Sequence, residues 1–198
     1  MMYQLVGASV LEVEIKKSRF IVTCVPVNSA DDVQNELSRL NRADATHNCW
    51  AWRIGEAYRF NDDGEPGGSA GRPMLAAIDG QNMDGVLAHV VRYFGGIKLG
   101  VGGLVRAYGN SVAECLRTAE KQEIIPYVRM RFSVDFSDTY AVYGLINQKK
   151  LCKLSETYTS DGVIFELSVQ AAAETEIRSR LNDATRARIT WLDEEIHV

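Results

Sequence analysis

The chain carries Phe60-Asn61-Asp62-Asp63-Gly64-Glu65-Pro66-Gly67-Gly68-Ser69-Ala70-Gly71-Arg72-Pro73-Met74-Leu75 and, further on, Arg92-Tyr93-Phe94-Gly95-Gly96-Ile97-Lys98-Leu99-Gly100-Val101-Gly102-Gly103-Leu104-Val105-Arg106-Ala107-Tyr108. These two segments hold a large share of the 16 glycines of the chain. Glycine adopts backbone conformations that other residues avoid and lets backbone amides approach a ligand closely. Each segment contains arginine and leads toward a helix-like pattern. We therefore expect two loops that offer a surface to an anionic partner.

Length and composition are those of an ordinary globular protein. The chain has 198 residues, of which 46% are hydrophobic and 24% charged, enough for one large domain or two small ones. No apolar run approaches the roughly 18 residues of a membrane helix, and Met1–Gly7 lacks the basic and apolar blocks of a signal peptide. The cysteines are widely spaced at Cys24, Cys49, Cys115 and Cys152. This spacing favours reduced, buried thiols in a cytoplasmic protein over disulfides or a zinc site.

The charge is spread evenly along the chain. Residues 1–127 carry 13 basic and 15 acidic side chains, and residues 128–198 carry 9 and 11, so each part has a net charge of −2. Neither part is a basic domain. If nucleic acid binds, it binds a local patch.

Hydrophobic periodicity predicts an α/β domain over residues 1–127. The first expected elements are a strand pair over 10–27, a helix after the N-cap Ser29, and strands from His47 and from Tyr58. A helix over 72–79 and a strand over 86–91 follow, and the strand is nearly all apolar, which predicts cover on both faces. The last element is a helix from Gly103, whose buried stripe contains Leu104, Tyr108, Val112, Cys115 and Ala119.

The pattern over residues 128–198 predicts a second, smaller domain. We expect a linker before it, over Glu123–Tyr127, with Pro126 as the residue that breaks regular structure. The expected elements are a strand over 128–136, a helix capped by Asp138 and ending near Lys149, strands over 151–159 and 163–169, a helix that carries Ile177, Leu181 and Ala184, and a last strand over 188–197. The order βαββαβ is the ferredoxin-like plan.

The second glycine-rich segment predicts an anion site where the helix begins. Unpaired amide groups and the helix dipole attract negative charge at Gly102 and Gly103, and Arg92, Lys98 and Arg106 add formal charge. The Gly95-Gly96 pair turns the chain between strand and helix. The alternative is a tight strand-to-helix connection that needs glycine for packing. The pattern is neither a Walker loop nor a Rossmann fingerprint.

The first segment carries three carboxylates, on Asp62, Asp63 and Glu65. They suit Mg²⁺ or Ca²⁺ through oxygen ligands, but Asp-Gly is also a common turn dipeptide, and we favour the turn. A further alternative is that Asp62 or Asp63 pairs with Arg72 or Arg92 and holds the two loops together.

The chain shows no persuasive catalytic set. His47 lies two residues before Cys49 on one strand face, which is weak evidence for a catalytic pair. Ser69 is not in the strand-to-helix elbow of serine hydrolases. The cluster Lys16-Lys17-Ser18-Arg19 is either a solvated turn or a phosphate contact.

At the two glycine-rich segments the chain resembles the IMPACT family, in its bacterial YigZ-type branch. The motifs that carry the resemblance are Lys17-Ser18-Arg19-Phe20, His47-x-Cys49, Asp62-Asp63-Gly64-Glu65-Pro66, Ala70-Gly71-Arg72-Pro73-Met74-Leu75, Val91-Arg92-Tyr93-Phe94-Gly95-Gly96, Leu99-Gly100-Val101-Gly102-Gly103-Leu104 and Ala107-Tyr108. Two small departures are Asn61, where serine is expected, and Ser69, where threonine is common.

The resemblance implies a ribosomal-protein-like α/β domain over 1–127, similar to domain IV of elongation factor G. It also implies a ferredoxin-like domain over 128–198, similar to domain V of that factor. Eukaryotic members regulate translation under stress by competing for the activator of an initiation-factor kinase, and that partner does not transfer to the bacterial branch. No catalytic residue set comes with the family, and we expect neither a metal nor a cofactor.

Three functions follow as hypotheses. The first is a non-enzymatic RNA- or ribosome-associated regulator of translation, which binds through the two loops and through Arg129 and Arg131. The second is a metal-assisted hydrolase or nucleotide-binding enzyme built on Asp62, Asp63 and Glu65. The third is a module that docks a translation factor or another protein. We expect no membrane partner.

Overall fold

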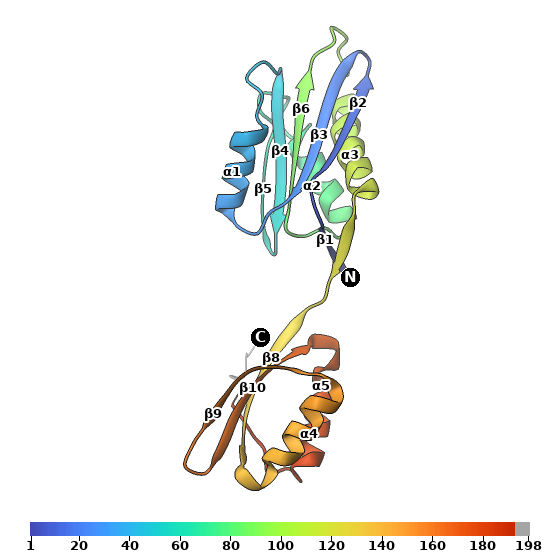
Figure 1. Cartoon of the computed structure of the whole chain (residues 1–198). Helices are drawn as coiled ribbons and strands as arrows, with labels where there is room; N and C mark the ends of the chain where they lie inside the picture. Colours follow the sequence, from blue (N-terminus) through green and yellow to red (C-terminus); the bar gives the residue numbers. More distant parts are fainter. Residues whose placement is uncertain (193–198) are drawn as a thin grey trace. The chain divides into compact units, whose positions relative to one another are not determined.

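The computed structural model describes residues 1–192, which form two compact units. The first unit spans Met1–Ile124, and the second begins at Ile125, three residues before the start expected at residue 128. Each unit has a mixed arrangement of helices and strands, shown in Figure 1. The two are described separately.

An antiparallel sheet of five strands forms the centre of the first unit (Figure 1). Its strands, in spatial order, are β2 (Ser9–Ile15), β3 (Ser18–Pro26), β6 (Val86–Tyr93), β4 (His47–Ile54) and β5 (Ala57–Asn61). The continuous apolar run of β6 predicts cover on both faces, and every residue of β6 before Tyr93 is buried. Helices supply that cover from both sides.

Helix α1 (Ala30–Leu40) lies against one face of the sheet. Ser29 is its N-cap, and the Ser29 hydroxyl accepts the amide of Asp32 at 3.1 Å, as the sequence predicts. The apolar stripe of the helix packs with Trp52 of β4 and Leu87 of β6.

Helices α2 (Gly71–Gly80) and α3 (Val101–Thr118) complete the larger core of the unit. The predicted stripe of α3 is buried at Leu104, Tyr108, Val112 and Cys115. The ring of Tyr108 meets that of Phe20 of β3 edge-on, with centroids 5.3 Å apart. Thus α3 covers the β2–β3 side of the sheet, and α2 covers its β4–β5 side.

A short ribbon closes the first unit, and the sequence analysis missed it. Strand β1 (Met2–Leu5) pairs with β7 (Lys121–Ile124). The linker expected over Glu123–Tyr127 is therefore wrong at both ends, because Glu123 and Ile124 belong to β7 and Tyr127 begins the first strand of the second unit. β1 and β7 have four residues each and no alternation of apolar and polar side chains, so their sequences do not predict strands. They form strands because their backbones pair with each other.

The second unit has the predicted order of strands and helices. Its elements are β8 (Tyr127–Asp135), the 3-10 turn η1 (Phe136–Asp138), α4 (Thr139–Lys149), β9 (Cys152–Tyr158), β10 (Gly162–Gln170), the 3-10 turn η2 (Ala171–Ala173), α5 (Glu174–Ala184) and β11 (Thr190–Trp191). The antiparallel sheet runs β11-β8-β10-β9 and has its own core, which includes Phe132 and Phe165. The strand expected over 188–197 is shorter within the described part, and residues 193–198 lie outside it.

Two expectations for side chains need correction. Asp138 sits at the N-cap of α4 but makes no capping hydrogen bond, because its carboxylate accepts two bonds from Arg188, at 2.5 and 2.9 Å. The cysteines are free, and three are buried as expected. Cys152 is exposed on the edge strand β9.

Candidate functional site

The sheet topology brings the two glycine-rich loops to one end of the first unit. We call residues 62–70, between β5 and α2, the first loop, and residues 94–100, between β6 and α3, the second loop. Strand β4 runs antiparallel to both β5 and β6, so its first residue, His47, lies beside the ends of both neighbours. The turn at Lys16 and Lys17 lies at the same end, because Arg19 pairs with Tyr93.

Asp62 fixes the first loop to the start of α2. Its carboxylate accepts the amides of Gly68, Ala70 and Gly71 at 2.7, 3.0 and 2.8 Å. Burial acts to raise the pKa of Asp62, but the three amide bonds outweigh it and lower the pKa. The N-terminus of α2 is thus occupied by an internal carboxylate and offers no open anion site.

Asp63 fixes the same loop to β4. Its carboxylate accepts the amide of Asn48 at 2.6 Å, and its carbonyl oxygen lies 2.7 Å from Nδ1 of His47. A carbonyl only accepts, so Nδ1 of His47 carries the proton in this contact. Gly64 follows with a φ of +82°, a conformation that favours glycine.

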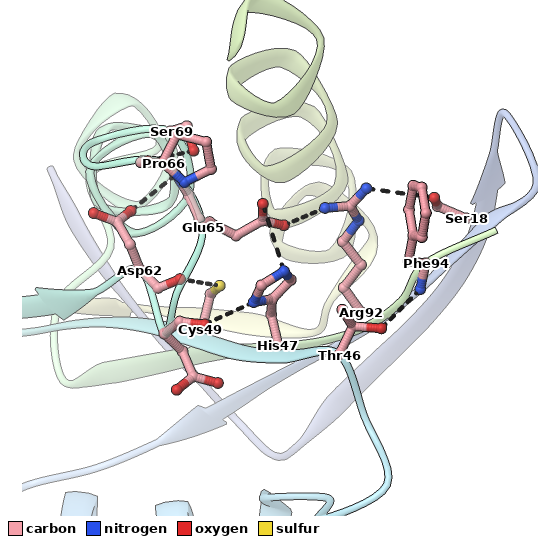
Figure 2. A network of polar contacts seen from close by, with 12 residues as sticks. Ser18, Thr46, His47, Cys49, Asp62, Glu65, Pro66, Ser69, Arg92 and Phe94 are labelled. Carbon is pink, nitrogen blue, oxygen red and sulfur yellow. Dashed lines mark hydrogen bonds and ion pairs between the residues drawn. The ribbon is translucent and has the colours of Figure 1, made fainter. Parts of the chain in front are cut away.

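Glu65 joins the two loops. Its Oε1 accepts Nη1 of Arg92 at 2.5 Å and the hydroxyl of Tyr108 at 2.7 Å, and all three residues are buried. Figure 2 shows the Glu65 side chain reaching toward Arg92. The sequence pattern left Asp62 or Asp63 as the acid that could hold the loops together. The acid is Glu65, since Asp62 and Asp63 bind backbone amides.

Cys49 completes this network without becoming a nucleophile. Its thiol donates to the carbonyl oxygen of Asp62 at 3.1 Å and lies 3.4 Å from the hydroxyl of Tyr108. Burial raises the pKa of Cys49 to about 12 and also raises that of Tyr108. The His47–Cys49 combination therefore supplies no thiolate at neutral pH.

The glycines at the second loop and the start of α3 differ in whether packing requires them. A side chain at Gly95 would place its Cβ 1.8 Å from the carbonyl oxygen of Lys17, so Gly95 allows the loop to pack on the β2–β3 turn. The hydroxyl of Ser18 accepts the Gly95 amide there at 3.2 Å. By contrast, Gly96 and Gly102 face open space or the end of a flexible side chain.

A pocket of about 440 Å³ lies where the two loops meet the start of α3; we call it the loop pocket. Its lining residues are Thr46, His47, Glu65, Pro66, Arg92, Phe94, Lys98, Leu99, Gly100, Val101 and Leu104. Most of the wall is apolar, and the polar groups come from both loops and from β4. Helix α3 begins at this pocket without a side-chain cap.

A second hollow of about 320 Å³ lies on the other side of Leu99, with Lys16 and Arg106 in its wall. Lys16, Lys98 and Arg106 are exposed, and none has an acidic partner among residues 1–192. We call these three residues the cationic rim. Together with the uncapped start of α3, they give this end of the unit a local positive surface.

The predicted site residues divide between this end and other places. Lys98 lines the loop pocket, Arg106 lines the second hollow, and Gly102 and Gly103 open α3. Arg92 lines the loop pocket but is buried against Glu65. Three others lie in different surroundings: Arg72 is exposed near the start of α2, Tyr93 donates to Asp44, and Arg129 of the second unit pairs with Glu166.

Phe94 is the residue that sequence reasoning missed. Its side chain is 45% exposed and lies against the guanidinium of Arg92, 5.6 Å from ring centre to carbon. The signal that could have marked it is its place directly before Gly95-Gly96, inside one of the motifs that carry the family resemblance.

The three carboxylates of the first loop do not form one ligand set, because each engages a different partner. In the part of the chain described, no group of three or more His, Cys, Asp or Glu side chains is arranged to hold a metal. Across residues 1–192, no helix has the length and apolar character needed to cross a membrane.

Comparison with known proteins places both loops inside a recognised domain. Residues 16–116 match the model of the Impact N-terminal domain. A Thermus thermophilus protein described as "IMPACT family member in pol 5'region" is 42% identical over 180 residues, covering 90% of this chain and 99% of that one. The chain belongs to the IMPACT family. The IMPACT family member YigZ of Escherichia coli is 34% identical over 186 residues, covering 90% and 91% of the two chains.

A solved structure of a hypothetical protein aligns with this IMPACT family member over 98% of both chains, with 32% identity and a TM-score of 0.66. The matched domain model covers the first loop, the second loop, the Lys16–Lys17 turn and most of α3. The candidate site therefore lies within the part of the chain that defines the family.

Proposed function

We propose that this IMPACT family member is a non-enzymatic RNA- or ribosome-associated protein that binds a phosphate backbone at the start of α3. The observation that carries the proposal is the cationic rim beside an uncapped helix N-terminus. Lys16, Lys98 and Arg106 have no acidic partner among the described residues, whereas Arg92 and Arg129 are already paired. Unpaired cations and free helix amides are the groups that bind phosphate oxygens.

The overall charge of −4 agrees with a local contact. A protein with no basic domain holds nucleic acid through a few phosphates, and its affinity then falls with salt in proportion to their number. The similarity expected between the two units and domains IV and V of elongation factor G points the same way, toward RNA and the ribosome. A role in regulating translation accords with family membership and rests on it.

The test is the affinity for a fluorescent single-stranded RNA of 12 nucleotides, measured by anisotropy across a KCl series. We expect the Lys98→Ala/Arg106→Ala variant to bind at least about five-fold more weakly at low salt, because two charged contacts are lost. The slope of log affinity against log salt should fall by about 0.7 for each lost phosphate contact.

Arg59→Ala is the control for one lost charge, since Arg59 is exposed, has no acidic partner among residues 1–192 and lies on β5, the opposite edge strand from β2. It should leave affinity and slope unchanged. A loss in Arg59→Ala half as large, in free energy, as that of the double variant would mean that only net charge matters. If this protein showed no affinity for RNA but still captured a partner protein after nuclease treatment, the docking function would be favoured instead.

A further inference from the structure

The loop pocket has a composition that a phosphate does not explain. Its wall is mainly apolar, contributed by Pro66, Phe94, Leu99, Val101 and Leu104. The charge of Arg92 is already balanced by Glu65. A phosphate suits the rim, at Lys98 and the start of α3, but inside the pocket it would meet apolar carbons and a carboxylate. The pocket interior therefore fits a neutral group.

Glu65 keeps one acceptor open inside this pocket. Its Oε1 takes both hydrogen bonds from Arg92 and Tyr108, while no donor among the described residues bonds to Oε2. Nε2 of His47 lies 3.8 Å from Oε2, beyond hydrogen-bond distance. A carboxylate oxygen that is nearly buried and lacks a donor favours a ligand that brings an N–H group.

Phe94 supplies a flat surface in the wall of the same pocket. Its ring is held against the Arg92 guanidinium, with 45% of the side chain still exposed. Exposed aromatic rings and arginine planes are the usual stacking surfaces for bases of single-stranded RNA. A volume of about 440 Å³ lies within the range of pockets that hold small planar ligands.

We infer that the loop pocket binds one unstacked nucleobase of a single-stranded RNA, a base with an exocyclic amino group that donates to Oε2 of Glu65 while its ring stacks on Phe94. The adjoining phosphate then lies at the start of α3 beside Lys98. This inference rests on the proposed function and adds to it the strandedness of the RNA and the kind of base. Uracil is the disfavoured base, because it has no exocyclic amino group and its one N–H of the ring edge, at N3, lies between two carbonyl oxygens that a carboxylate repels.

The test compares 12-nucleotide oligouridines that differ at one central position, which is uracil, adenine or unsubstituted purine. Purine differs from adenine only by the missing amino group. We expect the adenine strand to bind about ten-fold more tightly than the other two, as a hydrogen bond to a charged group predicts. The advantage should vanish when the strand is annealed to its complement.

Phe94→Ala should lower affinity for the adenine strand by about five-fold or more while leaving the salt slope intact, because it removes stacking and no charge. Tyr58→Ala is the matched control, since Tyr58 is 52% exposed and stacks on Arg53 away from the pocket. It should change neither quantity.

The two proposals fail in different ways. Salt-dependent binding with equal affinity for all three strands and no effect of Phe94→Ala overturns the base pocket and leaves RNA binding in place. Absence of binding to every strand at low salt overturns both.

Discussion

Glu65 is the residue on which the geometry of the site depends most. It carries its charge in a buried position, 8% exposed, and is compensated by Arg92 and by the hydroxyl of Tyr108. Breaking a buried ion pair leaves an uncompensated charge, whereas removing both partners relieves the cost. Comparing single and double substitutions therefore shows whether Glu65 and Arg92 stabilise the fold as a pair.

Glu65→Gln should lower the free energy of unfolding by about 3–5 kcal/mol, because Arg92 stays buried without its counter-charge. Urea unfolding followed by circular dichroism measures the loss. The double variant Glu65→Leu/Arg92→Leu should lose less than the sum of the two single leucine variants. Additive losses would mean that the pair is not coupled in the folded protein.

Asp62 should act through three amide bonds, with a characteristic dependence on pH. We expect Asp62→Asn to cost about 2 kcal/mol at pH 7, because a neutral amide accepts those bonds less well. The pKa of Asp62 is lowered in the folded protein, so the ionised form stabilises the fold above the unfolded pKa of about 3.9. That stabilisation is lost as the pH falls through the folded pKa.

The stability gap between the parent protein and Asp62→Asn should therefore be full at pH 7 and shrink below about pH 4. Urea titrations at stepped pH values measure it. A gap that widens on acidification would show that the carboxylate is not held in its charged form by the loop.

At the scale of elements, the packing of the second loop on the β2–β3 turn requires a residue without a side chain. Gly95→Ala should destabilise the first unit by about 1–3 kcal/mol, because the new Cβ would lie 1.8 Å from the carbonyl oxygen of Lys17. Gly67→Ala is the control, since nothing lies within 4 Å of its added Cβ. Thermal unfolding of both variants measures the difference. Equal melting temperatures would contradict the close packing of Gly95 on the carbonyl oxygen of Lys17.

Periodicity predicted the elements that present one face to a core. The stripe from Leu104 to Cys115 defined α3, and the apolar run from Val86 defined β6, since burial follows directly from these spacings. The β1–β7 ribbon escaped because its order comes from pairing between segments more than a hundred residues apart. Local sequence holds little information about such contacts.

The presence of two loops was predictable from their glycines, but the contacts between them were not. Antiparallel pairing of β4 with β5 and β6 brings both loops to one end of the sheet, and glycine content does not fix that pairing. Glu65 is the partner of Arg92 because the carboxylates of Asp62 and Asp63 accept hydrogen bonds from backbone amides instead. Spacing alone does not rank three acids within four residues.

At the scale of the whole molecule, each unit has its own hydrophobic core. The first is built on residues such as Phe20, Met74 and Tyr108, and the second on Phe132 and Phe165. A unit with an independent core is expected to fold alone. A fragment of residues 1–124 should unfold cooperatively on heating and keep the affinity of the full chain for single-stranded RNA.

A cooperative fragment with much weaker RNA affinity would contradict the placement of the contact in the first unit alone. The second unit would then contribute contacts of its own, and variants of Arg129 and Arg131 would test whether these come from β8. A fragment of residues 125–198 provides the complementary measurement.

The most direct test of the central claim is an NMR titration of the ¹⁵N-labelled protein with the adenine-containing RNA strand. The amide signals of Gly96, Gly102 and Gly103 should shift progressively and saturate together, while those of Gly7 and Gly144 stay in place. That result would show that the start of α3 and the second loop form the contact. Shifts confined to other glycines, with Gly102 and Gly103 unmoved at saturation, would contradict it.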